Sequence, residues 1–276
     1  MKKTILLFAA ATCFSTAMIA QSNQTIKLNK GAQYQVENKI ESSSNTEVQG
    51  QSMESKINIT TNYLVNVKDQ KGSNYNLTNT VTHLLTSISM MGQDINFDSD
   101  KKEDLDGEMG SAVKDYLNVP KNVVMDNTGK IVSTDDTDAA SSAVANQLNL
   151  AATGFGAQLT FLALPKNPKV GDKWTESTND NGIKRTNNYT IKSIDGNIVT
   201  VAFEGTADTD SKMENMGMEM TTKTSGKFSG EDKVDKKTGV VQSNTSTGEA
   251  SGTVSAMGQD FPITTKITST TTVKSL

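Results

Sequence analysis

The chain has 276 residues, of which 34% are hydrophobic and 5% are aromatic. This length suffices for one large β or α+β domain, or for two small ones. The low apolar content favours a sheet that is covered on one face over a thick two-sided core. With 31 acidic and 27 basic residues the formal net charge is −4, which argues against nucleic-acid binding. The apolar residues are regularly phased and the charges are mixed in sign, so we reject disorder.

The N-terminus has the pattern of a secretory signal peptide. Lys2 and Lys3 precede a short apolar run over residues 5–14, and we expect cleavage after Ala20, which makes residues 1–20 the signal peptide. Cys13, the only cysteine, lies inside this segment. A lipoprotein anchored at Cys13 is the alternative, but the residues before Cys13 form a weak lipobox. We therefore expect an exported chain, periplasmic or secreted, without disulfides.

Removal of Lys2 and Lys3 leaves 25 basic residues (27 − 2) against 31 acidic ones, a net charge near −6. No second apolar run is long enough for a membrane span.

The cleanest strand pattern covers residues 57–67. Apolar side chains fall on alternate positions, with polar side chains between them, as in an antiparallel strand buried on one face. The apolar positions are Ile57, Ile59, Tyr63, Val65 and Val67. The phase slips at Leu84 and Leu85, where we expect a β-bulge.

One tetrapeptide occurs twice, as Met91-Gly92-Gln93-Asp94 and as Met257-Gly258-Gln259-Asp260. We interpret both copies as tips of β-hairpins, with Gly-Gln as the two-residue loop of a type II′ turn. This register places Met90 opposite Ile95 and Ile88 opposite Phe97 in the first hairpin. In the second hairpin it places Ala256 opposite Phe261 and Val254 opposite Ile263. Pro262 suggests that the second hairpin is an edge hairpin or has a wider loop.

The middle of the chain has helical periodicity. Residues 103–117 place apolar side chains at helical spacing, although Gly107 and Gly110 weaken the helix. A short strand pair is expected at 123–125 and 130–133, followed by a second helix over about 137–151 with a cap at Thr137 or Asp138. Residues 155–164 are the most apolar run after the signal peptide, and the pattern allows either a helical extension or a buried strand.

After Pro165 and Pro168 the chain returns to strands, with a strong hairpin signal at Asn181-Gly182. The order strands, helices, strands predicts an α+β, mainly β fold: one large curved antiparallel sheet of hairpins, a half-barrel, with about two helices on its concave face. Two separate sheets are the alternative. We expect a single domain over residues 21–276 with a loose internal duplication, its halves at about 21–164 and 165–276.

The residue inventory excludes several chemistries. His83 is the only histidine, which excludes a His-based triad together with multi-histidine metal sites, and we expect a partly exposed sheet histidine. The acidic residues near Gly107 do not fit an EF-hand loop, since Lys102 and Val113 would stand where acids are required. One methionine cluster is the minor candidate for a Cu(I) site, against gap filling by methionine. Its members are Met213, Met216, Met218 and Met220.

At Leu164-Pro165, at Val170-Gly171-Asp172-Lys173-Trp174 and at the two Met-Gly-Gln tips, the chain resembles an uncharacterised exported β-rich family of Gram-negative bacteria. By architecture alone it also looks like the LolA-like lipoprotein-carrier half-barrels, which hold acyl chains between sheet and helices. No functional residue carries over from either resemblance. For Trp174 we expect packing under the sheet.

We therefore expect a protein without enzymatic activity or cofactor that binds an apolar ligand, a lipid or a lipoprotein acyl chain, between the sheet and its helices. A structural or adhesive protein that binds protein or polysaccharide through its Thr/Asn-rich outer face is the alternative. The oligomeric state and the ligand are not encoded in any pattern that we find. Candidate lining residues are Val65, Val81, Phe155, Leu159, Phe161, Leu162 and Phe203.

Overall fold

The computed structural model describes residues 25–48, 50–90, 93–135, 155–180, 182–215, 218–256 and 258–276. The expected signal peptide and the expected helix at 137–151 lie outside these residues. The first group of strands in the described residues is β1 (Gln33–Val48), β2 (Gln51–Lys71), β3 (Asn74–Met90), β4 (Gln93–Asp98), β5 (Lys121–Asp126) and β6 (Ile131–Thr134). The second is β7 (Lys173–Asp180), β8 (Ile183–Asp195), β9 (Ile198–Asn215), β10 (Met218–Asp235), β11 (Val241–Ala256) and β12 (Gln259–Ser275). Between the groups lie the short helices α1 (Lys102–Leu105), α2 (Glu108–Val113) and α4 (Phe155–Thr160).

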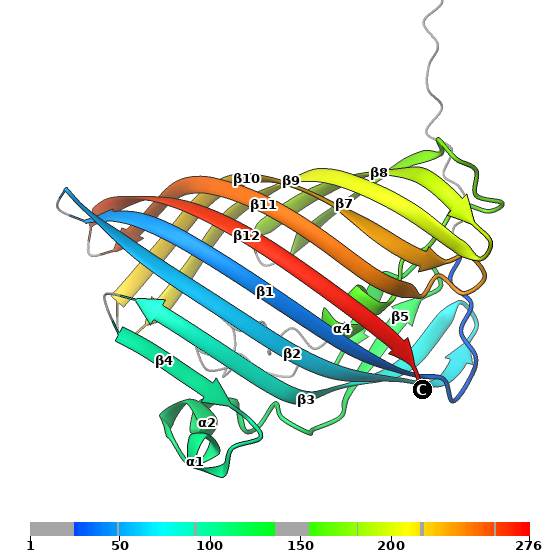
Figure 1. Cartoon of the computed structure of the whole chain (residues 1–276), viewed down its shortest axis with the longest axis horizontal. Coiled ribbons are helices and arrows are strands. Elements are labelled where there is room, and N and C mark those ends of the chain that lie inside the picture. The colour runs from blue at the N-terminus through cyan, green and yellow to red at the C-terminus, as the bar shows by residue number, and fades with distance from the viewer. Residues whose placement is uncertain are drawn as a thin grey trace, which may run out of the picture.

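All of these strands belong to one 12-stranded antiparallel sheet with the order β6-β5-β3-β2-β1-β12-β11-β10-β9-β8-β7, and β4 pairs with β3 beside that path. The first long strand joins the last, from Tyr34 opposite Ser275 to Thr46 opposite Ile263. Figure 1 shows β1 and β12 side by side at the middle of the sheet. The expected half-barrel is therefore confirmed, and the alternative of two separate sheets is wrong, because the β1–β12 pairing connects both halves.

For both hairpin tips the predicted register was wrong: the observed pairing is shifted by one position on each strand. Met90 pairs with Gln93, so Ile88 lies opposite Ile95. Ala256 pairs with Gln259, so Val254 lies opposite Phe261. In the second tip, Gly258 takes the second turn position rather than the first, with φ 75°, which only glycine adopts readily.

The alternation in β2 is confirmed, with Ile59, Val65 and Val67 buried on one face. The predicted bulge exists but lies earlier than expected. Asn62 pairs with His83 and Tyr63 pairs with Val81, so Thr82 is the extra residue. The bulge restores the inward phase on β3, where Val81 precedes it and Leu84 follows it.

The helix predicted over 103–117 is instead two short helices that meet at Gly107, the N-cap residue of α2. A Cβ on Gly110 would lie 2.2 Å from the carbonyl oxygen of Leu105. The absence of a side chain therefore lets the second helix turn back closely on the first. The run at 155–164 combines both expected structures: helix α4, then an extended segment in which Phe161 forms an isolated bridge with Val240.

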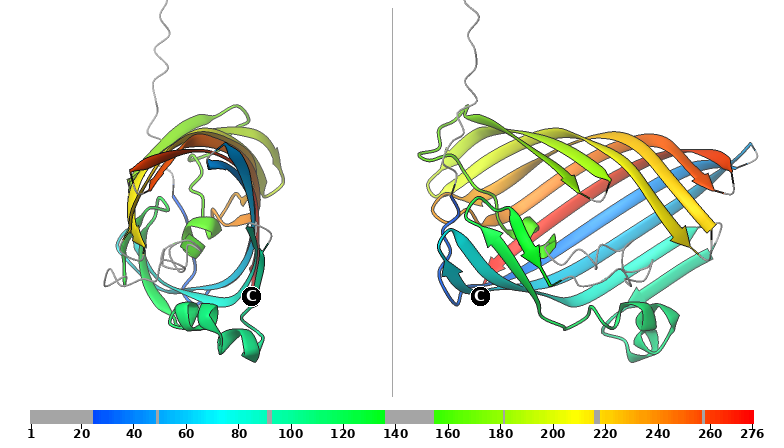
Figure 2. Two further views of the ribbon diagram at one scale, coloured as in Figure 1. Left: turned by 90° about the vertical axis from the view of Figure 1, so that its left-hand side faces the viewer. Right: turned by 180° about the vertical axis from the view of Figure 1, so that it is seen from behind.

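One end of the curved sheet is closed by packing. Figure 2 shows α4 inside the curve, whereas α1 and α2 lie at the rim beside β4 (Figure 1). The backbone N–H of Ile26 donates to Asn127 O at 2.7 Å, and that of Leu162 donates to Gly239 O at 2.9 Å. These segments cover Tyr34, Val36 and Tyr63, which belong to the larger core cluster. Among the described residues no helix combines the length and hydropathy that a transmembrane segment needs.

Candidate ligand-binding face

The concave face is organised in rows that run across the strands, because cross-strand partners point to the same side. Nearest the closed end is an apolar row that includes Val36, Tyr63, Val199, Val234 and Val273. The next row toward the hairpin tips is polar, and the row after it is aromatic on one side and aliphatic on the other. The packed core thus ends within the sheet, and the remaining concave surface has a different character.

The polar row crosses five neighbouring strands through Thr61, Asn38, Thr271, Asn244 and Asp232. Asn38 is 2% exposed and donates through Nδ2 to Thr271 Oγ1 at 2.9 Å and to Ser269 Oγ at 3.2 Å. Asn244 Nδ2 donates to Asp232 Oδ1 at 2.7 Å. Hydrogen bonds of this kind offset the free energy of burying polar groups.

The aromatic row begins at the edge strand β7. Trp174 stacks on Tyr189 with ring centroids 4.9 Å apart, and Tyr189 is followed by Phe203 at 6.1 Å and Phe228 at 6.3 Å. Trp174 is 7% exposed, so its expected packing role is confirmed. The four rings form a continuous apolar strip from β7 to β10.

Two carboxyl groups flank this strip. Glu176 lies two residues beyond Trp174 on the same face, and Asp232 lies in the polar row with 7% exposure. Burial raises the pKa of Asp232 to about 6, and the hydrogen bond from Asn244 lowers this pKa by a smaller amount. Burial likewise raises the pKa of Glu176, whose carboxyl faces Trp174 and Tyr189. Burial and then the Glu176 charge raise the pKa of the Tyr189 phenol.

Beyond these rows, half-buried aliphatic side chains line the concave face. Ile40, Ile57, Ile88 and Ile263 are intermediate in exposure, and Ile267 is 42% exposed. Between them and Phe228 the inward positions of β11 are small: Ser246, Gly248, Ala250 and Gly252. At roughly 3.4 Å per residue this stripe is about 20 Å long. An extended apolar chain could lie on it between Phe228 and Ile267.

The structure divides the predicted lining residues between two places. Val65, Val81 and Phe161 are buried in the larger core cluster, against which Leu159 packs. Leu162 and Phe203 pack against the second cluster, around Trp174. Phe155 begins α4, and its side chain lies outside the described residues. Among the lining residues that can be placed, Phe203 alone belongs to the aromatic strip.

Sequence reasoning missed Glu176, Tyr189 and Asp232. A signal existed for Glu176, because its parity with Trp174 puts both on one face of a strand. Asp232 offered no such signal, since Glu231 and Lys233 beside it make the segment look solvated.

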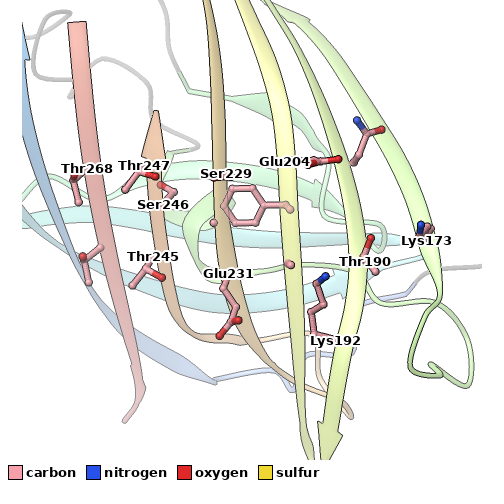
Figure 3. A pocket seen from close by; sticks show the side chains of 15 residues that line it. Lys173, Thr190, Lys192, Glu204, Ser229, Glu231, Thr245, Ser246, Thr247 and Thr268 are labelled. Carbon is pink, nitrogen blue, oxygen red and sulfur yellow. The ribbon is translucent and has the colours of Figure 1, made fainter. Parts of the chain in front are cut away.

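The outer face carries a separate feature, shown in Figure 3. A shallow depression of about 710 Å³ lies over β7 to β12. Lys173, Lys192, Glu204 and Glu231 supply charges of both signs. Outward hydroxyl groups also line it, from Thr190, Ser229, Thr245, Thr247, Thr268 and Thr270.

His83 lies on β3 with its side chain 22% exposed, and its Nε2 is 3.0 Å from Asp98 Oδ1 and 3.6 Å from Asp100 Oδ2. The backbone N–H of Asp100 and then His83 hold the pKa of Asp98 below its usual value. These three residues can bring one ligand atom each within 4.8 Å of one another, but the hydrogen bond between His83 and Asp98 already accounts for the arrangement.

The methionine cluster falls on the β9–β10 hairpin, where Met213 pairs with Met220 and Met218 pairs with Asn215. Met216 lies outside the described residues.

A family model described as a family of unknown function (DUF6263) matches residues 72–160 and 157–241. No protein of curated function matches the chain.

Among solved structures, one titled for lipid–protein interactions in lipovitellin has a TM-score of 0.49 at 12% identity, with 90% of this chain covered. This chain spans only 25% of that one. An outer membrane channel from Pseudomonas putida F1 has a TM-score of 0.26 at 10% identity, with 91% and 98% of the two chains covered. The translocator domain of the autotransporter NalP from Neisseria meningitidis has a TM-score of 0.23 at 6% identity, with 90% of each chain covered. Likeness this distant carries no functional argument.

Proposed function

Because the chain belongs to a family of unknown function, DUF6263, its family supplies no activity, and we propose from the geometry that it binds an elongated apolar ligand along its concave face. The ligand class is a lipid or an acyl chain. The proposed activity is binding without catalysis, in an exported protein whose first 20 residues are removed.

The observation that carries this proposal is the half-buried aliphatic and aromatic floor beyond the packed core. Soluble proteins usually bury such side chains or scatter them. Here Ile57, Phe228, Ile263 and Ile267 line one concave face around the small residues of β11. A concave, mainly apolar surface with a few polar groups is the usual form of a small-molecule site.

Size supports a chain-shaped ligand over a compact one. The stripe from Ser246 to Gly252 is about 20 Å long and follows a single strand, so it suits a linear hydrocarbon. Each methylene that leaves water for this surface contributes about 0.8 kcal/mol. A long acyl chain would therefore reach measurable affinity even with partial contact.

The test is native mass spectrometry of protein purified from its own cell envelope. Bound lipid that persists through purification is the expected result. Trp174 is the only tryptophan, so its emission should also change when an acyl chain is added to delipidated protein. Protein free of lipid that neither binds acyl chains nor changes its Trp174 emission would contradict the proposal.

The outer depression supports a second candidate function, binding of a polysaccharide. Rows of hydroxyl groups with Lys192 and Glu231 among them offer both donors and acceptors to sugar hydroxyls. A glycan-binding screen would test it with Thr245→Val and Thr247→Val as variants. If these variants bind the glycan as tightly as the unmodified protein, the glycan-binding site lies elsewhere on the molecule.

A further inference from the structure

The two carboxyl groups beside the aromatic strip lack a basic partner. Within the described part of the chain, neither Glu176 nor Asp232 forms an ion pair. No cationic group there contributes to the pKa of either carboxyl group. Asp232 is 7% exposed. A buried carboxylate is normally paired with a cation or neutralised by a proton. At a pH where both carboxyl groups are ionised, a positive group from outside the chain would therefore stabilise them.

A neighbour of Glu176 offers a further hydrogen-bond acceptor. Its cross-strand neighbour Asn187 donates through Nδ2 to Tyr189 Oη at 2.9 Å, while Asn187 Oδ1 is buried without a hydrogen-bond partner in the described residues. Trp174, which is more than nine-tenths buried, and Tyr189 both interact with the Glu176 carboxyl and lower its pKa against the larger effect of burial. The site therefore has one spare acceptor, Asn187 Oδ1, beside a negative charge.

Aromatic faces complete the surroundings. Tyr189 and Phe203 lie 6.1 Å apart, and Phe203 is only half-buried. A cation close to such rings is stabilised by their quadrupoles. The aromatic strip also continues to Phe228, which borders the small-residue stripe of β11. A group held at Glu176 would thus sit at one end of the apolar floor.

We propose that Glu176, Asn187 and Asp232 form the head-group end of the ligand site and select a ligand with an ammonium group. This inference rests on the proposed function, since the apolar floor holds the remainder of the ligand. Glu176 at the rim and Asn187 Oδ1 accept hydrogen bonds from the ammonium, and Asp232 behind them adds negative charge. An acyl chain that ends in a carboxylate meets like charge and binds more weakly than one that ends in an ammonium group.

The experiment compares three ligands with the same alkyl chain, namely decylamine, 1-decanol and decanoate, bound to delipidated full-length protein at about pH 7.5. Decylamine should bind at least about tenfold more tightly than decanoate, with decanol between them. Glu176→Gln and Asp232→Asn should each reduce this preference. Glu249→Gln, which removes an exposed carboxyl from the outer face of β11, is the control and should leave it unchanged.

Equal affinity for the three ligands, or a preference that survives Glu176→Gln combined with Asp232→Asn, overturns the head-group assignment while the apolar site stands. Binding of none of them overturns both. A second readout covers the case in which a variant does not fold, since the preference of the unmodified protein should weaken below about pH 6 as Asp232 takes up a proton. The charges of Glu231, on the outer face of the same strand, and of Glu176 act on Asp232, and the polar groups near it are Tyr189 and Asn244. A preference that does not change with pH contradicts the role of Asp232.

Discussion

Phe203 of β9 packs directly over Gly230, its cross-strand partner in β10. A Cβ at Gly230 would lie 2.5 Å from Phe203 Cζ and 2.3 Å from the carbonyl oxygen of Thr245. The same relationship is repeated one row further, where a Cβ at Gly205 would lie 2.6 Å from Phe228 Cζ. Each ring therefore occupies the space that a side chain on the opposite residue would need. The ring covers the glycine, and the absence of a side chain there lets the sheet curve tightly.

Gly230→Ala should destabilise the protein by about 1–3 kcal/mol, because the methyl group meets a ring and a backbone carbonyl that cannot both withdraw. Urea denaturation measures the loss. Ser229→Ala, on the outer face beside it, is the control and should change stability by less than about 0.5 kcal/mol. Equal stability of the two variants would show that β10 shifts freely.

Asn38→Ala should cost about 1–3 kcal/mol, since it removes the donor to Thr271 and Ser269 in a buried row. The double variant Asn38→Val with Thr271→Val should lose less than the sum of the single valine variants, because no polar partner is left behind. Chemical denaturation of the four proteins gives the coupling free energy. Additive losses would mean that the observed hydrogen bond does not contribute.

Stability should depend on pH through Asp232. Its pKa in the folded protein, about 6, is raised from 3.8 by burial, so the folded state holds the proton more tightly than the unfolded state. Its favourable contribution is complete below about pH 4 and is lost as the pH rises through about 6. Relative to Asp232→Asn, the unmodified protein should lose on the order of 3 kcal/mol between about pH 4 and pH 7.

Unfolding free energies of both proteins across this range provide the measurement. The comparison with Asp232→Asn cancels the titration of the other carboxyl groups. A constant difference between the two proteins would contradict the raised pKa.

Ile267→Glu should weaken binding of an acyl chain by about tenfold or more, because it places a charge on the apolar floor. Ile267 is 42% exposed, so the fold should tolerate the change, with a stability loss within about 1 kcal/mol. Thr268→Glu puts the same charge on the outer face one residue away and should leave binding intact. Trp174 emission with added acyl chain measures both variants. Loss of binding in Thr268→Glu alone would move the site to the outer face.

The pattern within a single segment predicted the structure correctly where that segment alone determines it. Alternation in β2 predicted the inward face of Ile59, Val65 and Val67, since successive residues of a strand point to opposite sides. The order strands, helices, strands predicted the half-barrel. The alternation did not predict the turn register at Met90 and Gln93, because glycine fits either central position of a two-residue turn and only the pairing of the whole strands selects one.

The candidate site depended on contacts between distant segments. His83 was expected to be a partly exposed sheet residue, and its partner Asp98 became visible only when β4 paired with β3. The pairing of Asn38 with Thr271 joins residues 233 positions apart. No periodicity in a single segment carries such information.

The amino-acid sequence by itself determined which side chains of each strand turn inward, because that depends only on the two-residue repeat of an extended backbone. The tertiary structure alone decided that β1 lies against β12 and that Glu176 and Asp232 share the concave face beside Tyr189. A charged residue next to other charged residues looks solvated in the sequence. It becomes a buried carboxyl group only when the sheet curls and neighbouring strands exclude water from it.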